Sequence, residues 1–148
     1  MESINEIYQK AMIFIRQSTC LHRSYCAIII NPDGSSSFGY SHAPISYINC
    51  KAENKCKRDE FKSKFSQVAE FFEECQVIHA EMDVIVNLKS NEVTDASRIY
   101  LLGIDNSKNT VHKSAFPCEI CKKLLIEIGF NRIFIFQTEY ELKEINLY

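Results

Sequence analysis

The spacing of hydrophobic residues predicts a helix followed by a β-hairpin in the first third of the chain. Apolar side chains recur at intervals of three or four residues, at Ile4, Ile7, Tyr8, Ala11 and Ile15. Ser3 and Glu6 stand in the order of a capping box, so we expect this helix to cover about residues 3–17. Residues 24–41 contain two strand-like runs on either side of "NPDG", whose proline and glycine favour a turn, and they predict a hairpin.

The middle of the chain is less regular. Residues 42–58 are polar, contain two cysteines and show no periodicity, which indicates a loop. Residues 59–75 predict a helix, because one helical face collects four apolar side chains, Phe61, Phe65, Val68 and Phe72. The stretch "VIHAEMDVIVNL" predicts a further helix that begins near His79, with three side chains facing inward, Val84, Ile85 and Leu88.

The last third alternates strands with one clearly delimited helix. "SRIYLLGI" at 97–104 predicts a buried strand, and "DNSKNTVHKSA" at 105–115 a long polar loop. A helix is expected from Pro117 to the stop at Gly129, with four side chains buried, Ile120, Leu124, Leu125 and Ile128. "NRIFIFQT" at 131–138 predicts another strand, and the pattern assigns no element to the last ten residues.

This order of elements is typical of an α/β protein. Strands that alternate with helices predict a three-layer α/β/α sandwich around a mixed sheet of about five strands. We expect a single domain over residues 1–148, with a cysteine-bearing insertion at about 42–76.

Composition and charge narrow the class of protein. The chain is 46% hydrophobic and 24% charged, as in ordinary globular proteins, and its net charge is −2 with acids and bases intermixed. This balance argues against a nucleic-acid-binding face. The acidic N-terminal stretch does not resemble a secretory signal, and no apolar run approaches the roughly 20 residues that cross a bilayer. We therefore expect a cytoplasmic protein without a membrane partner.

The seven cysteines change the picture further. Their number is odd, and in a reducing compartment clustered cysteines indicate metal binding or catalysis rather than disulfides. Cys26 lies within "YCAIII" and is typical of a small buried side chain. The pair in "PCEIC" does not fit that description.

These two cysteines, Cys118 and Cys121, begin one predicted helix, and His79 begins another. In a layered α/β fold the N-termini of two such helices can converge. One nitrogen and two sulfur ligands leave the fourth position of tetrahedral Zn²⁺ open, as in catalytic sites. Helix N-termini favour thiolates, and bound zinc lowers the pKa of a water molecule from about 16 to roughly 7. Glu81 is placed to move that proton rather than to bind the metal.

The two motifs, H-A-E at 79–81 and P-C-x-x-C at 117–121, resemble the zinc-dependent cytidine/deoxycytidylate deaminase superfamily. The alternative, a core histidine and buried cysteines in this order by coincidence, leaves five fixed residue types unexplained. The deoxycytidylate deaminases are most similar, and the resemblance spans most of the chain. They share a Cys-x-x-Arg element, a Gly-Tyr pair, a following proline and cysteines ahead of H-x-E, matched here by Cys20, Arg23, Gly39, Tyr40, Pro44, Cys50, Cys56 and Cys75.

The resemblance implies a cytidine deaminase-like fold, a homo-oligomer, and hydrolytic deamination of a free cytosine nucleotide, dCMP or a close analogue, to the uracil product and ammonia. It implies that His79, Cys118 and Cys121 bind the zinc ion and that Glu81 carries protons. Candidates for contact with the substrate are Arg23, Tyr40, Ser41, His42, Ala80, Phe116 and Pro117. Lys113 is a further candidate for a 5′-phosphate and Tyr140 for stacking on the base, although solvated charges and ordinary packing are the common roles of such residues.

Three departures from the family pattern leave the substrate open. "GYSH" places Ser41 where related enzymes have the asparagine that holds the sugar, and His42 where they have glycine. Asp83 stands where the family often has asparagine, and the loop that leads into Pro117 is longer than usual. Another small ring, such as a free base, nucleoside, modified cytosine or pterin-like compound, is therefore a second hypothesis.

A second group of cysteines, Cys20, Cys50, Cys56 and Cys75, predicts a structural zinc site that would pin the insertion to the core. His22 is an alternative fourth ligand. Free thiols are the competing interpretation, because the spacing is loose and contains no C-x-x-C.

Two further hypotheses remain. Deamination of a single-stranded nucleic acid or tRNA would need a basic, aromatic-lined channel, which the scattered lysines do not predict. A non-catalytic, zinc-stabilised binding domain would have no use for Glu81.

Overall fold

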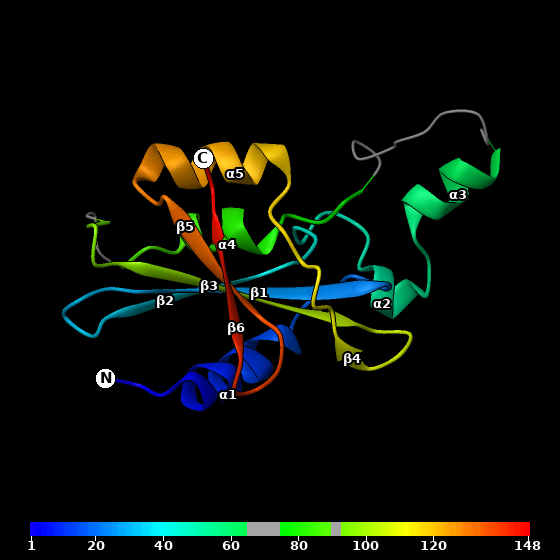
Figure 1. Ribbon diagram of the computed structural model, residues 1–148. Coiled ribbons are helices and arrows are strands. Elements are labelled where there is room, and N and C mark those ends of the chain that lie inside the picture. The colour runs from blue at the N-terminus through cyan, green and yellow to red at the C-terminus, as the bar shows by residue number, and fades with distance from the viewer. Residues whose placement is uncertain (65–74, 90–92) are drawn as a thin grey trace.

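The computed structural model of the chain describes residues 1–64, 75–89 and 93–148. A mixed sheet forms the middle layer, with α1 (Ile4–Ile15) on one face and α4 (Ala80–Val86) and α5 (Glu119–Ile128) on the other (Figure 1). The predicted three-layer α/β/α arrangement is therefore confirmed. No helix among the described residues is both long and apolar enough to cross a membrane.

The sheet contains six strands in the described residues, in the order β2-β1-β3-β5-β6, with the short β4 paired to the end of β3. Among the described strands only β3 and β5 pair in parallel, and α5 connects them across the face that α4 also covers. The strands are β1 (Arg23–Ile30), β2 (Ser36–Tyr40), β3 (Arg98–Asp105), β4 (Thr110–Val111), β5 (Arg132–Phe136) and β6 (Leu142–Asn146).

Alternation along the strands divides the core into two layers. In β1, Cys26 and Ile28 face α1, whereas Ala27 and Ile29 face α4 and α5. This follows from the two-residue period of a strand, and its consequence is that both faces of the central strands are apolar. The capping box of α1 forms as predicted between Ser3 and Glu6.

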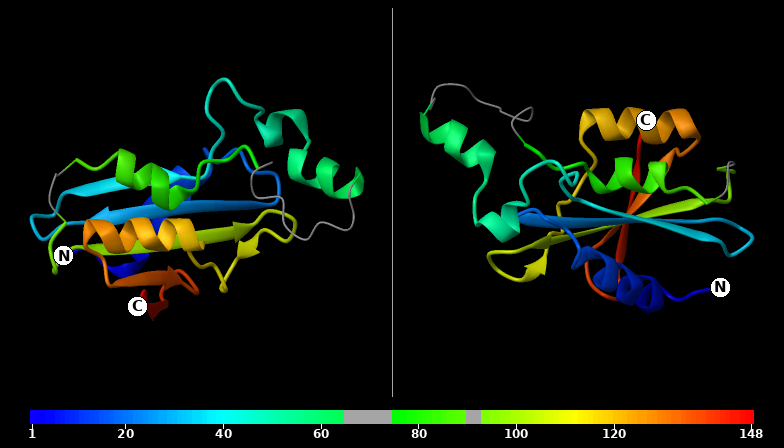
Figure 2. Two further views of the ribbon diagram at one scale, coloured as in Figure 1. Left: turned by 90° about the horizontal axis from the view of Figure 1, so that it is seen from above. Right: turned by 180° about the vertical axis from the view of Figure 1, so that it is seen from behind.

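The described part of the predicted insertion contains a helix that the sequence did not predict. The expected loop at 42–58 contains a single-turn helix, α2 (Cys50–Glu53), where Asn49 caps the first turn by accepting a hydrogen bond from Ala52 N. In place of the helix expected over 59–75, the described residues contain α3 (Lys57–Lys64). This helix lies away from the sheet (Figure 2). Three residues of its predicted apolar face, Phe65, Val68 and Phe72, lie outside the described residues.

The burial predicted for α5 is wrong at two positions. Ile120 is 63% exposed and Leu124 39% exposed, whereas Leu125 and Cys121 are buried. The helix lies on one face of the sheet, so only one stripe of its surface reaches the core. Ile120 and Leu124 belong to the outer stripe.

We predict that Gly39→Ala will disrupt the fold. A Cβ atom at residue 39 would lie 2.2 Å from Val84 N and 2.6 Å from Ala80 O, because α4 rests directly on the backbone of β2. The free energy of unfolding, measured by denaturant titration, should fall by about 3 kcal/mol or more.

Gly34→Ala is the matched control. Gly34 has φ +84° but no atom within 4 Å of an added Cβ, so this change should cost only about 1 kcal/mol of backbone strain. Equal losses in the two variants would contradict the close approach of α4 to β2.

Candidate active site

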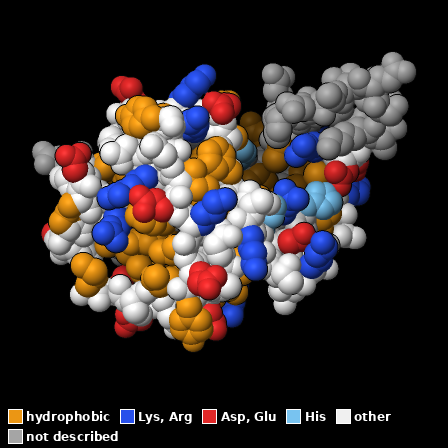
Figure 3. All heavy atoms as spheres, in the orientation of Figure 1, with side chains coloured by type: hydrophobic (Ala, Val, Ile, Leu, Met, Phe, Trp, Pro, Cys, Tyr) orange, Lys and Arg blue, Asp and Glu red, His pale blue; other side chains and the backbone are white. Residues whose placement is uncertain are grey.

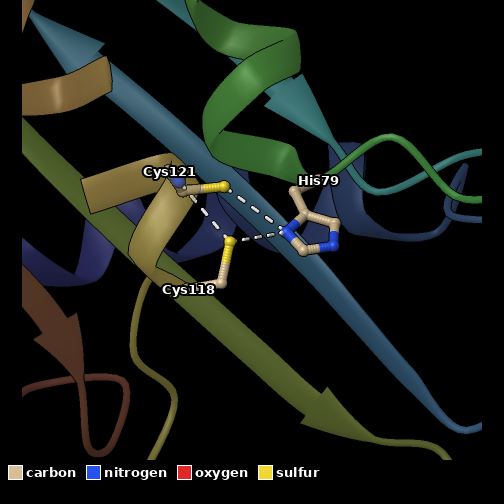
Figure 4. A group of neighbouring side chains, drawn as sticks. All are labelled: His79, Cys118 and Cys121. Carbon is tan, nitrogen blue, oxygen red and sulfur yellow. Dashed lines mark hydrogen bonds between the residues drawn. The ribbon is translucent and has the colours of Figure 1, made fainter. Parts of the chain in front are cut away.

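The structure brings His79, Cys118 and Cys121 together at the N-termini of two helices. His79 is the N-cap residue of α4 and Cys118 that of α5, with Cys121 in the first turn of α5. The imidazole Nδ1 lies 3.5 Å from Cys118 Sγ and 3.4 Å from Cys121 Sγ, with both sulfurs on the same side of the ring (Figure 4). One nitrogen and two sulfurs are thus presented to a common point.

This arrangement fits a zinc ion. Zinc binds nitrogen at about 2.0 Å and sulfur at about 2.3 Å, so the nitrogen and sulfur ligands of a tetrahedral ion lie about 3.5 Å apart. The observed N–S distances of 3.4 and 3.5 Å match that spacing. Three ligand atoms would leave the fourth position of a tetrahedral ion for another ligand.

Burial controls the protonation of the ligands. Burial lowers the pKa of His79, which favours the neutral imidazole that binds metals. Burial also raises the pKa of the Cys121 thiol, and the carboxylate of Glu81 adds to this effect. Cys118 Sγ accepts a hydrogen bond from Cys121 N at 3.4 Å. A metal ion must therefore displace a proton from Cys121, and its affinity should decrease as the pH falls.

Glu81 is the buried carboxyl group of the site. Its side chain lies at the start of α4 and the residue is only 5% exposed. Burial raises the pKa of Glu81, opposed in part by its own backbone N–H. A general acid/base must both accept and donate a proton, and a raised pKa makes the protonated form of this carboxyl group more accessible.

A cavity of about 550 Å³ opens beside these residues. His79, Glu81 and Cys118 form one wall. Tyr25 also lines the cavity, although its sequence pattern did not indicate this role. It lies on the same face of β1 as Ala27 and Ile29, the face covered by α4 and α5. Further along, the lining includes side chains from the insertion and from the end of β3, namely Cys56, Arg58, Asp59, Cys75 and Asp105.

The predicted substrate residues divide into two groups. Arg23, Ser41 and Phe116 line the cavity, although the Ser41 hydroxyl is engaged with Ser18 Oγ at 2.8 Å and Tyr25 N at 3.0 Å. The described lining does not include the other candidates, Tyr40, His42, Ala80, Pro117, Lys113 and Tyr140. The side chains of Ala80 and Pro117 are buried in the core.

The second group of cysteines lies near the same cavity. The ligand atoms of His22, Cys56 and Asp59 all lie within 4.8 Å of one another. Cys20 and Cys75 also line the cavity, and Cys50 is buried close enough to the other three cysteines for their charge to raise its pKa, after the larger effect of its own burial. The structure thus places a histidine and a carboxylate beside Cys56, in addition to the predicted sulfurs.

Comparison with known proteins shows the family of the chain. The family described as "Cytidine and deoxycytidylate deaminase zinc-binding region" matches residues 1–137, and the chain belongs to that family. A search of curated proteins finds no match.

Solved structures share the fold. A cytidine deaminase from Burkholderia pseudomallei is 13% identical, with a TM-score of 0.59 over 99% of this chain and 94% of that one. A dCMP deaminase from the cyanophage S-TIM5, solved with dCMP and dUMP, is 21% identical, with a TM-score of 0.54 over 91% of this chain and 82% of that one. At these identities the likeness is one of architecture.

We predict that Cys118→Ser will lower zinc content and stability together. Serine is a poor zinc ligand, and a metal that binds only the folded state stabilises it. Metal analysis should show the loss of one equivalent of zinc, and the melting temperature should approach that of the chelated wild-type protein.

Cys26→Ala is the matched control, because Cys26 is fully buried in the layer that faces α1. It should retain zinc at the wild-type level and lose only about 1 kcal/mol of packing. Zinc content equal to that of the wild type in Cys118→Ser would remove Cys118 from the ligand set.

Proposed function

We propose that the protein catalyses the zinc-dependent hydrolytic deamination of a free cytosine nucleotide, with dCMP as the leading substrate. The observation that carries this proposal is the buried Glu81 beside the His79, Cys118 and Cys121 ligand group, in one cavity that Arg23 also lines. A volume of about 550 Å³ lies in the range of small-molecule sites.

When bound, the zinc ion supplies a Lewis acid that activates water. Glu81 Oε takes a proton from the attacking water and gives it to the ring nitrogen next to the carbon that carries the amine. The same carboxyl group then delivers a second proton to the amine, which leaves as ammonia while the ring keeps the water oxygen. The surrounding apolar packing limits the access of other water molecules, which suits a single carboxyl group that moves both protons.

The charges along the cavity support a phosphorylated substrate. His22, Arg23 and Arg58 line the part that includes the insertion, and Arg23 also contacts the Tyr25 side chain. A guanidinium group can bind phosphate oxygens through two parallel hydrogen bonds. Asp59 and Asp105 share this wall, which favours a single small anion over a long polyanion.

Other substrates are less well supported. On the face shown in Figure 3, lysine and arginine side chains are interspersed with acidic ones rather than joined in a track for a nucleic acid. The altered "GYSH" segment and the long loop before Pro117 keep a different small ring as the alternative substrate. A purely structural zinc domain is disfavoured, because burying Glu81 costs stability without a structural return.

A homo-oligomer in the cytoplasm completes the proposal. The outer stripe of α5, with Ile120 and Leu124, is an exposed apolar surface that a second copy of the chain would cover. Seven free cysteines suit a reducing compartment.

We predict that the zinc-loaded protein deaminates dCMP. The reaction is measured by the release of ammonia and by the loss of cytosine absorbance. The panel should include CMP, dCTP, cytidine, cytosine and single-stranded DNA. Glu81→Gln is the matched control, because it preserves shape but cannot carry the proton, and it should retain zinc while kcat falls by at least about 10³-fold. The proposal fails if dCMP is inert while cytosine or the oligonucleotide is converted.

We also propose that Cys56 binds a second, structural zinc ion, because it belongs to both the predicted cysteine group and the group with His22 and Asp59. Wild-type protein should contain two equivalents of zinc and Cys56→Ser one. Loss of the second equivalent in Asp59→Asn would select the histidine–carboxylate group, and its loss in Cys75→Ser the cysteine group. One equivalent in the wild type would contradict a second site.

A further inference from the structure

The helix that carries both His79 and Glu81 begins without a side-chain cap. His79 is the N-cap residue of α4, but its imidazole faces the two cysteines and makes no capping hydrogen bond. The helix has only seven residues, and so short a helix is not stable on its own. Contacts from outside the helix must therefore fix its first turn.

His42 and Asp83 supply these contacts, and we call this pair the latch. The backbone of His42 exchanges two hydrogen bonds with Ile78, of 3.2 and 2.8 Å, immediately before His79. The His42 ring Nε2 donates to Asp83 Oδ1 at 3.0 Å, and Tyr40 N donates to Asp83 Oδ2 at 3.1 Å. The end of β2 is thus joined to the chain on both sides of His79 and Glu81.

The latch joins two positions at which the sequence departs from the family pattern that it resembles. His42 and Asp83 occupy positions where the enzymes that it resembles have glycine and often asparagine, and the structure shows that the two departures contact each other. Asp83 also places a carboxylate in the first turn of α4, where the helix dipole favours negative charge.

The position of the latch separates it from substrate contacts. Neither residue is among the described residues that line the cavity. The side chains are 25% and 12% exposed, so their contact is better shielded from water than a surface ion pair. Any influence on the reaction must pass through the backbone of α4.

We propose that His42 is a positioning residue that, through Asp83, holds His79 and Glu81 in place against the paired cysteines of α5. The kinetic part of this inference rests on the proposed deaminase function. The structural part does not, because the orientation of His79 also decides how well the site binds a metal ion.

The test compares His42→Leu with His42→Gln. Leucine fills similar space without a donor, whereas glutamine keeps an N–H group that can reach Asp83. Leucine should lower kcat per bound zinc by about tenfold or more and change KM by less than about threefold, and glutamine should restore most of the loss. Asp83→Ala and the double variant with His42→Leu should each lose about as much as His42→Leu alone, because the two residues act as one unit.

Arg132→Ala is the control, since Arg132 and Glu144 form an ion pair at 2.9 Å between β5 and β6. It should leave kcat and KM unchanged. Unchanged kcat per zinc in His42→Leu, with only a lower melting temperature, would overturn the proposal, as would fully additive effects in the double variant.

Titration of the zinc-free protein with Co²⁺, followed by sulfur-to-metal charge-transfer absorption, separates this inference from the proposed function. His42→Leu should bind Co²⁺ about tenfold or more weakly than wild type, and His42→Gln nearly as tightly. If the wild type binds Co²⁺ but converts no cytosine compound, the proposed function fails and the latch is judged by this affinity alone. Equal Co²⁺ affinity in His42→Leu and wild type would then overturn the latch.

Should His42→Leu not fold, Asp83→Asn and Asp83→Ala make the same comparison, with the asparagine variant expected to bind Co²⁺ more tightly.

Discussion

Two helices whose first turns are far apart in the sequence must present their N-termini to one point, and this requirement governs the structure. Cys118 lies 39 residues beyond His79, yet their ligand atoms are 3.5 Å apart. The sheet meets the requirement because β3 and β5 are parallel and α5 crosses between them on the face that α4 already covers. The close approach of α4 to Gly39 then fixes the height of His79 above the sheet.

The site is assembled at a cost to stability. Glu81 is a buried carboxyl group, and Cys121 is a buried thiol beside it. Burial disfavours the charged form of each group and raises the pKa of both. The apolar layer around Ala27, Ile29 and Leu101 offsets this cost in the metal-free protein. A bound cation would change the balance, because it stabilises the thiolate that burial disfavours. We therefore expect a bound metal ion to stabilise the folded state.

The sequence predicted most of the fold, and the failures have physical causes. Strong periodicity revealed α1, the hairpin, β3 and β5, because each of these elements buries a regular face. By contrast, β6 is an edge strand with exposed charges at Lys143 and Glu144, so it carries little hydrophobic signal. The burial predicted for the outer stripe of α5 was wrong for the opposite reason. Ile120 and Leu124 are apolar and so carry a hydrophobic signal, but both side chains are exposed.

The part of the candidate site that could be predicted is the part in which metal binding or proton transfer requires particular residue types. The three candidate ligands and Glu81 were indicated by their order, their spacing and the family resemblance, and the structure places them together. Tyr25 could not be recognised in this way, because a tyrosine in a strand usually serves the core. His42 and Asp83 could be recognised only as departures from a pattern, since the contact between them depends on how β2 meets α4.

The cavity also has walls of different origin. The reactive groups come from α4 and α5, which the core holds rigidly, whereas Cys56, Arg58, Asp59 and Cys75 come from the insertion and its flanks. Substitutions in that peripheral segment can alter which molecule is admitted without disturbing the reactive groups. The entrance of the cavity can therefore differ in shape and charge independently of the side chains that α4 and α5 hold together.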